Sequence, residues 1–132
     1  MANPNIAALT SIFGNTTYLT PSATTAVVLL PNPASSGYVF RINQLVAANV
    51  NGTNAVDTTV SIYTNGGVNQ GSAPSGGTAY PIASTVSVPA DASLIVVDKT
   101  TAIYLTEGTS ISVTSGTASG ITYTISYEII TA

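Results

Sequence analysis

The segment Ile121-Thr-Tyr-Thr-Ile-Ser-Tyr-Glu-Ile129 decides the fold class, because apolar and polar side chains alternate along its whole length. In an extended chain, successive side chains point to opposite faces. The isoleucines and tyrosines of this segment therefore share one face, and the threonines, Ser126 and Glu128 share the other. This pattern predicts a β-strand with one buried face and one solvated face.

Other runs rich in Val, Ile, Thr and Tyr, the residue types that favour strands, recur toward the N-terminus. Run 38–50 is long and needs a β-bulge, because Phe40 and Ile42 are out of phase with Leu45. No helical period of comparable length is present. About nine strands are predicted, at residues 6–13, 24–30, 38–50, 57–64, 84–88, 94–98, 102–106, 110–114 and 121–129.

Turn-forming residues separate these runs at the short spacing that is typical of antiparallel pairing. The turn signals are Gly14-Asn15, Asn51-Gly52, Pro89-Ala-Asp91 and Glu107-Gly108, and Pro31-Asn-Pro33 is expected to end the strand before it. The predicted fold is all-β: an antiparallel β-sandwich of jelly-roll or immunoglobulin-like type, with no significant helix.

The length of 132 residues suits a single domain over residues 1–132. Residues 1–13 are predicted to form an N-terminal arm or an edge strand. The longest connection, at residues 65–79, is rich in glycine. We expect this connection to be either mobile or ordered only against a partner.

Only 5% of the residues are charged, against about 25% in a typical soluble protein. The chain has no histidine and no cysteine, so the commonest general bases, nucleophiles and transition-metal ligands are missing. Arg41 and Lys99 are too few to neutralise the phosphates of a nucleic acid. No apolar run approaches the roughly 20 residues of a membrane span, and the start of the chain lacks the features of a signal peptide. We therefore expect no nucleic-acid partner and no membrane partner.

Five carboxylates are the remaining candidates for chemistry: Asp57, Asp91, Asp98, Glu107 and Glu128. A glycosidase needs two carboxylates roughly 5 to 10 Å apart across a cleft. Positions in predicted turns and on a solvated strand face account for these residues without catalysis, and no calcium-loop pattern of Asp and Asn is present. We expect no enzymatic activity, no cofactor and no metal site, with a carboxylate hydrolase as an alternative.

The tyrosines divide into two groups. Tyr123 and Tyr127 share a face with three isoleucines, so we expect them in the core with hydroxyls that need hydrogen-bond partners. Tyr80, next to Pro81 after the glycine-rich connection, is the best candidate for an exposed tyrosine that contacts a ligand. Packing in a core or an interface is the commoner role for this residue type.

The scarcity of charge also bears on the edges of the predicted sheets. Monomeric β-proteins protect edge strands with charges, especially lysine, yet Lys99 is alone and lies in a predicted turn. We expect neighbouring subunits or a larger partner to cover the edges and neutral faces, with proline and bulges as the remaining protection. Arg41 is predicted to point opposite Phe40 and Ile42, and to pair with an acidic group within the chain or across an interface.

Several segments resemble small virion structural proteins of tailed phages, particularly those that infect cyanobacteria. They are Met1-Ala-Asn-Pro-Asn-Ile6, Ser11-Ile-Phe-Gly-Asn-Thr16, Val88-Pro-Ala-Asp-Ala-Ser-Leu-Ile-Val-Val-Asp-Lys99, Ile103-Tyr-Leu-Thr-Glu-Gly-Thr-Ser-Ile-Ser-Val113 and Ser126-Tyr-Glu128. The resemblance implies a non-enzymatic β-sandwich on the particle, a capsid decoration or cement protein that binds the assembled shell, often as a trimer. Such proteins act through surface contacts, so no functional residue is transferred.

The resemblance also implies where the protein works and what it meets. The expected partners are the major capsid protein or another virion protein, together with further copies of this chain. The expected location is the capsid surface, after synthesis in the host cytoplasm without a signal peptide. A receptor-binding module, or a fibre, tail or neck module of the same virion, is the alternative. The candidate partner contacts are Asn3, Pro4, Asn5, Ile6, Arg41 and Tyr80.

Overall fold

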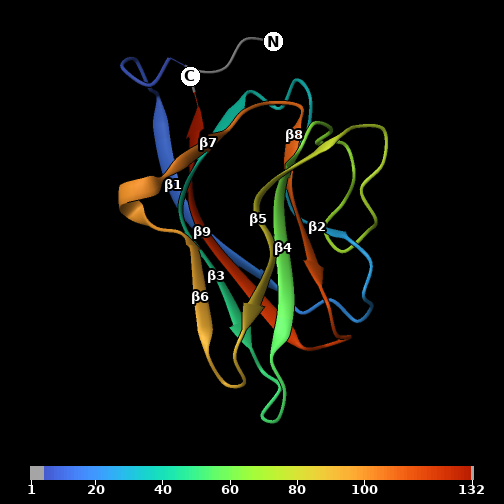
Figure 1. Ribbon diagram of the computed structural model, residues 1–132. Helices are drawn as coiled ribbons and strands as arrows, with labels where there is room; N and C mark the ends of the chain where they lie inside the picture. The colour runs from blue at the N-terminus through green and yellow to red at the C-terminus, as the bar shows by residue number, and fades with distance from the viewer. Residues whose placement is uncertain (1–4, 132) are drawn as a thin grey trace.

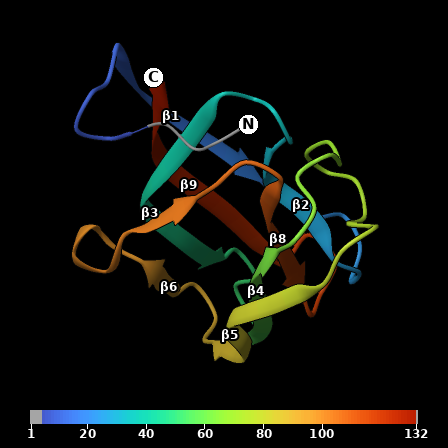
Figure 2. The same ribbon diagram turned by 90° about the horizontal axis from the view of Figure 1, so that it is seen from above.

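The computed structural model describes residues 5–131, and within them nine strands form two antiparallel sheets (Figure 1). Sheet A has the order β1 (Ser11–Leu19), β9 (Ile121–Thr131), β3 (Tyr38–Asn49) and β6 (Ser93–Val97), and β7 (Ile103–Leu105) also pairs with β3. Sheet B has the order β2 (Val27–Asn32), β8 (Thr109–Ser115), β4 (Val56–Tyr63) and β5 (Ala79–Val88). The 3-10 turn η1 (Lys99–Thr101) joins β6 to β7. Figure 2 shows the two sheets face to face, so the predicted antiparallel sandwich is confirmed.

Strand β9 lies at the centre of sheet A, between β1 and β3. Its inward side chains are Ile121, Tyr123, Ile125 and Tyr127, all of which are buried in the core cluster. The predicted alternation is therefore confirmed over most of the strand. It breaks at the C-terminal end, where Ile130 is buried and Ile129 only partly so.

The predicted bulge in β3 is confirmed at Asn43. Ile42 pairs with Tyr127 and Gln44 pairs with the preceding residue of β9, so Asn43 is the extra residue. The bulge restores the phase of the strand, because Ile42 and Leu45 are both fully buried although they lie three positions apart.

The N-terminal strand differs from the prediction. β1 begins at Ser11 instead of Ile6, and residues 5–10 form turns that include an Asx turn in which Ala7 N donates to Asn5 Oδ1 at 3.0 Å. The predicted Gly14-Asn15 turn is wrong, because both residues lie in the middle of β1 and pair with β9. Gly14 does not adopt a positive φ, so it is a strand residue without a side chain.

The boundaries of the strands in sheet B also differ from the predicted ones. β2 runs through Pro31 and ends at Asn32, and β5 begins at Ala79 instead of Ser84. β5 pairs only with β4 and β2 only with β8, so both are edge strands, the position in a sheet where proline is tolerated. Pro81 accordingly lies within β5.

The glycine-rich connection between β4 and β5 is held by hydrogen bonds to its own domain. Val28 N donates to Ser72 O at 2.9 Å, and Gly71 N donates to Val28 O at 2.8 Å. Ser110 Oγ donates to Asn65 O at 2.9 Å. The connection thus packs against β2 and β8 of its own chain. The outward serines of sheet B are buried accordingly: Ser61, Ser110 and Ser112.

Two buried asparagines link the sheets. Asn32 of β2 donates through Nδ2 to Tyr38 O at 3.1 Å and to Leu105 O at 3.0 Å, both in sheet A. Asn49 of β3 donates through Nδ2 to Val88 O of β5 at 2.8 Å. Each amide thus satisfies buried carbonyl groups where main-chain ladders cannot reach across the sandwich.

Tyr123 carries a buried polar group at the centre of the core. Its hydroxyl donates to Thr114 O at 2.9 Å and accepts a hydrogen bond from the Thr58 hydroxyl, as we expected for a buried tyrosine. Burial raises the pKa of the Tyr123 phenol from 10.0 to about 12, and the Thr58 hydrogen bond acts in the opposite direction. Ionisation of the Tyr123 phenol therefore destabilises the folded state.

We predict that the protein loses stability as the pH rises from 10 to 12. A group whose pKa is higher in the folded than in the unfolded state stabilises the fold fully below pH 10. This stabilisation is lost as the pH rises through the folded-state pKa of about 12. The free energy of unfolding should fall by up to about 1.4 kcal/mol per pH unit in this window. Urea titrations at several pH values measure it. The Tyr123→Phe variant is the control, and an equally steep fall in that variant would contradict the assignment.

Candidate functional site

The outer face of sheet A, which points away from sheet B, is nearly free of charge. Among the residues in its five strands, the charged ones are Arg41 on β3 and Glu128 on β9. Four large hydrophobic residues alternate onto this face and are about half exposed or more: Ile12, Tyr18, Ile95 and Tyr104. We call these four residues, with Arg41 and Glu128, the sheet A face.

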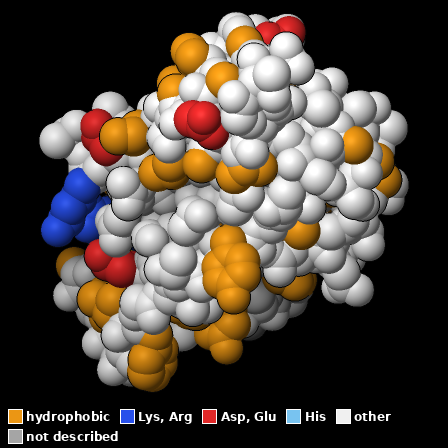
Figure 3. All heavy atoms as spheres, turned by 90° about the horizontal axis from the view of Figure 1, so that it is seen from below, with side chains coloured by type: hydrophobic (Ala, Val, Ile, Leu, Met, Phe, Trp, Pro, Cys, Tyr) orange, Lys and Arg blue, Asp and Glu red, His pale blue; other side chains and the backbone are white. Residues whose placement is uncertain are grey.

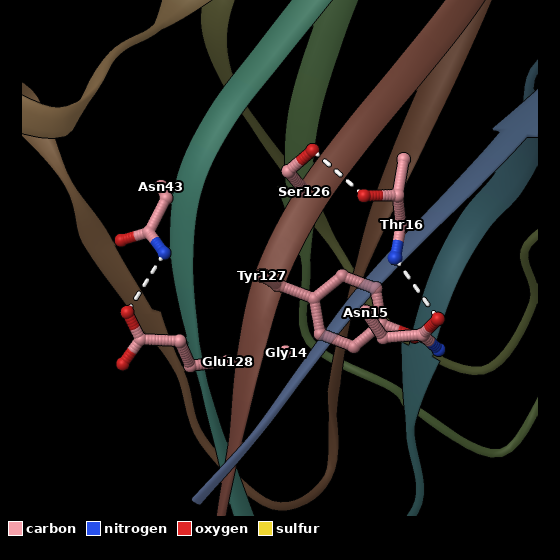
Figure 4. A pocket seen from close by; sticks show the side chains of 7 residues that line it. All are labelled: Gly14, Asn15, Thr16, Asn43, Ser126, Tyr127 and Glu128. Carbon is pink, nitrogen blue, oxygen red and sulfur yellow. Dashed lines mark hydrogen bonds between the residues drawn. The ribbon is translucent and has the colours of Figure 1, made fainter.

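A hollow of about 650 Å³ opens on sheet A where β1, β9 and β3 lie side by side (Figure 4). Two features of the strands create it. Gly14 contributes no side chain, and a Cβ placed there would have no atom within 4 Å. Asn43, the extra residue of the β3 bulge, lines the hollow from the other side. The lining residues are Gly14, Asn15, Thr16, Asn43, Ser126, Tyr127 and Glu128.

Hydrogen bonds orient the polar side chains around the hollow. Asn43 Nδ2 donates to Glu128 Oε1 at 2.9 Å, and the hydroxyls of Thr16 and Ser126 are 2.9 Å apart (Figure 4). Asn15 Nδ2 donates to the hydroxyl of Tyr127 at 2.9 Å. Asn43 Oδ1 is buried and accepts no hydrogen bond from the described residues. The hollow therefore offers neutral donors and acceptors around one carboxylate.

The ion pair of the sheet A face lies beside this hollow. Arg41 Nη1 is 3.8 Å from Glu128 Oε1, and both side chains are about one-third exposed. The prediction that Arg41 pairs with an acidic group is confirmed, within the chain. An exposed pair at this distance contributes little stability. Its main effect is to balance the two charges on an otherwise neutral surface.

The other carboxylates lie away from the hollow. Asp57 is exposed on β4, and Asp91 lies in the β5–β6 turn with a φ of 57°. Asp98 caps η1, and hydrogen bonds from Thr100 and Thr101 hold the pKa of its carboxyl below the usual value. Glu128 is thus the one carboxylate that lines the hollow, whereas glycoside hydrolysis uses two. No group of metal-ligating side chains occurs among residues 5–131.

The predicted contact residues do not form one site. Tyr80 is 60% exposed, as expected, but it lies on β5 of sheet B, whereas Arg41 lies on β3 of sheet A. Asn5 forms the Asx turn before β1, and Ile6 beside it is exposed. The candidate contacts Asn3 and Pro4 lie outside the described residues.

The two core tyrosines are placed as predicted, and the other tyrosines divide into buried and exposed ones. Tyr123 and Tyr127 are buried, and so is Tyr63, which donates its hydroxyl to Gly77 O at 3.0 Å. Tyr18 is 72% exposed, more than Tyr80. The sequence reasoning missed Tyr18 and Tyr104 as surface residues of the sheet A face. Thr16 and Thr20, two positions before and after Tyr18, were a signal for that residue.

The scarcity of charge is visible on the molecular surface. Figure 3 views the molecule from below, where most atoms belong to neutral polar side chains or the backbone. Charged side chains form small isolated groups, and hydrophobic side chains lie in several patches between them. A surface of this kind loses less free energy on desolvation than a charged one, so it is suited to close contact with another protein.

No protein-family model matches this chain, and no curated protein matches it. Among the described residues, no helix is long and apolar enough to cross a membrane.

Proposed function

We propose that this chain is a non-enzymatic structural protein of a tailed-phage virion, which binds the assembled capsid shell as a decoration or cement protein. The observation that carries the proposal is the sheet A face, which combines four exposed hydrophobic side chains with a single balanced ion pair. Exposed apolar groups on a neutral background are typical of protein contact surfaces. The partner would be the major capsid protein, or another virion protein, on the capsid surface.

The proposal needs no catalytic group, cofactor or nucleic acid. The hollow on sheet A adds hydrogen-bonding groups from Asn43, Thr16 and Ser126 to the same surface. These groups can fix the orientation of a partner chain while the hydrophobic residues supply most of the binding energy. The resemblance favours a trimer of this chain on the shell.

A second candidate is a receptor-binding module, or a fibre, tail or neck module of the same virion. It is favoured by Tyr80 and Ile82, which lie exposed on the edge strand β5 of sheet B. An exposed tyrosine can stack on a sugar ring of a host glycan. The two candidates therefore use different sheets, which makes them separable by substitution.

We predict that Ile95→Lys combined with Tyr104→Lys weakens binding to purified expanded shells by about tenfold or more. Both side chains are exposed, so the fold should be unaffected, and the added charges would have to be desolvated on contact. Co-sedimentation of the purified protein with expanded and immature shells measures this. Binding should be seen with expanded shells only.

Tyr80→Lys is the control on the other sheet, since it places one such charge at an exposed tyrosine of sheet B. Its affinity for shells should equal that of the wild type. If Tyr80→Lys abolishes binding and the sheet A variant does not, the shell contact lies on sheet B and not on the sheet A face. A wild-type protein without affinity for shells would overturn the decoration assignment.

A further inference from the structure

The four edges of the two sheets are protected to different degrees. On β2, the main-chain groups of Val28 already bond to the glycine-rich connection: Val28 N donates to Ser72 O, and Gly71 N donates to Val28 O. Pro31 on the same strand lacks an N–H group. On β5, Pro81 also lacks an N–H group, Thr85 has a φ of 50°, and the pairing with β4 shifts register twice. These are the devices by which neutral strands avoid edge pairing.

The opposite edge of sheet A is short and interrupted. β6 has five residues and β7 has three, and the capped turn η1 separates them. The remaining edge is β1, which has nine residues, no proline and no charge. It is thus the longest edge strand without a bulge or proline among the described residues.

The outward main-chain groups of β1 can be identified from the ladder of sheet A. Val50 N donates to Gly120 O, so the even-numbered residues of β9 bond to β3 and the odd-numbered ones to β1. Their partners on β1 are also odd-numbered, such as Phe13 opposite Ile129. The N–H and C=O groups of Ile12, Gly14, Thr16 and Tyr18 therefore point away from the sheet.

Side chains of the protein itself occupy the C-terminal half of this edge. Thr16 N donates to Asn15 Oδ1 at 2.9 Å, and Gln70 Nε2 donates to Tyr18 O at 3.4 Å. Thr10 N, beyond the other end, donates to Thr131 O at 3.3 Å. Between these contacts, Ile12 and Gly14 present main-chain groups to solvent. The side chains of Ile12 and Phe13 are 52% and 61% exposed.

We propose that two copies of this chain pair antiparallel through the N-terminal half of β1, around a twofold axis at Phe13. In this register, Ile12 of each copy lies opposite Gly14 of the other, and each such pair exchanges two main-chain hydrogen bonds. The two Phe13 side chains lie directly opposite each other at a non-hydrogen-bonded position, where cross-strand side chains are closest. The pairing continues sheet A from one copy into the next.

The free stretch fits a second copy of itself better than an unrelated strand. It is self-complementary in size, because the large Ile12 side chain lies over the position where Gly14 has none. It contains no charge, so two copies bring no like charges together. Two aromatic rings in register add the stabilisation that cross-strand aromatic pairs give.

This inference goes beyond the proposed function, which does not depend on how the copies associate. It commits to a twofold contact, whereas the resemblance favours a trimer. It uses β1, whereas the shell test uses β6 and β7. The two proposals can therefore fail independently.

Sedimentation equilibrium over a concentration series tests the pairing. The wild type should associate into dimers, and Phe13→Lys should weaken association by at least about tenfold, because it places like charges directly opposite. Tyr18→Lys is the matched control on the same strand, at the end that Gln70 occupies, and it should associate like the wild type. A monomeric wild type, or a trimer that Phe13→Lys leaves intact, would overturn the proposal.

A cross-link gives an independent test that does not depend on losing a function. The chain contains no cysteine, so Phe13→Cys introduces a single thiol. Directly opposite residues at a non-hydrogen-bonded position have a Cβ separation compatible with a disulfide. Mild oxidation should convert the Phe13→Cys variant to a covalent dimer much faster than the Tyr18→Cys variant. Equal rates for the two variants would contradict the register.

Discussion

Gly66→Ala should lower the free energy of unfolding by about 3 kcal/mol or more, because two segments of main chain touch this glycine. A Cβ at residue 66 would lie 2.0 Å from Asn32 O and 2.7 Å from Thr109 O. Both contacts are backbone atoms of strands in sheet B, which cannot move without disturbing the ladder. Gly66 thus allows the glycine-rich connection to lie directly on β2 and β8.

Urea denaturation of the purified variant measures this loss. Gly67→Ala is the matched control, since its nearest contact is the side-chain oxygen of Asn65 at 3.3 Å, which can move. We expect the control to change the free energy of unfolding by less than about 1 kcal/mol. If Gly66→Ala is as stable as the control, the connection does not pack against sheet B as described.

Asn32→Leu should be similarly harmful, at about 3 kcal/mol, although it replaces a polar side chain in the core with an apolar one of similar size. The side chain of Asn32 is fully buried, donates to Tyr38 O and Leu105 O, and accepts from Ser36 Oγ at 2.6 Å. Leucine would leave these groups without their partner, and each buried unsatisfied group costs roughly 1 to 3 kcal/mol.

Thermal and urea unfolding of Asn32→Leu would be compared with Asn54→Leu, a control at an exposed asparagine of the β3–β4 turn. The control should stay within about 0.5 kcal/mol of the wild type. An Asn32→Leu variant that is more stable than the wild type would show that the apolar gain exceeds the lost hydrogen bonds. The hydrogen bonds of Asn32 would then not contribute to holding the two sheets together.

The strands that could be predicted from the sequence are those whose signal is local. The alternation from Ile121 to Tyr127 and the phase shift between Ile42 and Leu45 are visible in the sequence, and the structure confirms both. The predicted turn at Gly14 is wrong, because glycine occurs both in turns and at strand positions that need no side chain. Asn32, flanked by prolines, likewise suggested a turn, although its amide links the two sheets.

The features that could not be predicted depend on contacts between distant segments. Ser110 and Ser112 alternate with Ile111 and Val113, yet both serines are buried. Ser110 donates to Asn65 O of the glycine-rich connection, and nothing in β8 itself indicates this contact. The candidate site also depends in part on contacts between distant segments. The outward position of Glu128 was predictable, as was a partner for Arg41. The hollow needed Gly14 to lie beside the bulge at Asn43, across three strands.

The copy number of this chain in purified virions tests the proposed function most directly. Quantitative mass spectrometry can compare its peptides with those of the major capsid protein in the same particles. A decoration or cement protein predicts a copy number comparable to that of the shell subunits. A few copies per particle, or none, would contradict a role on the capsid surface.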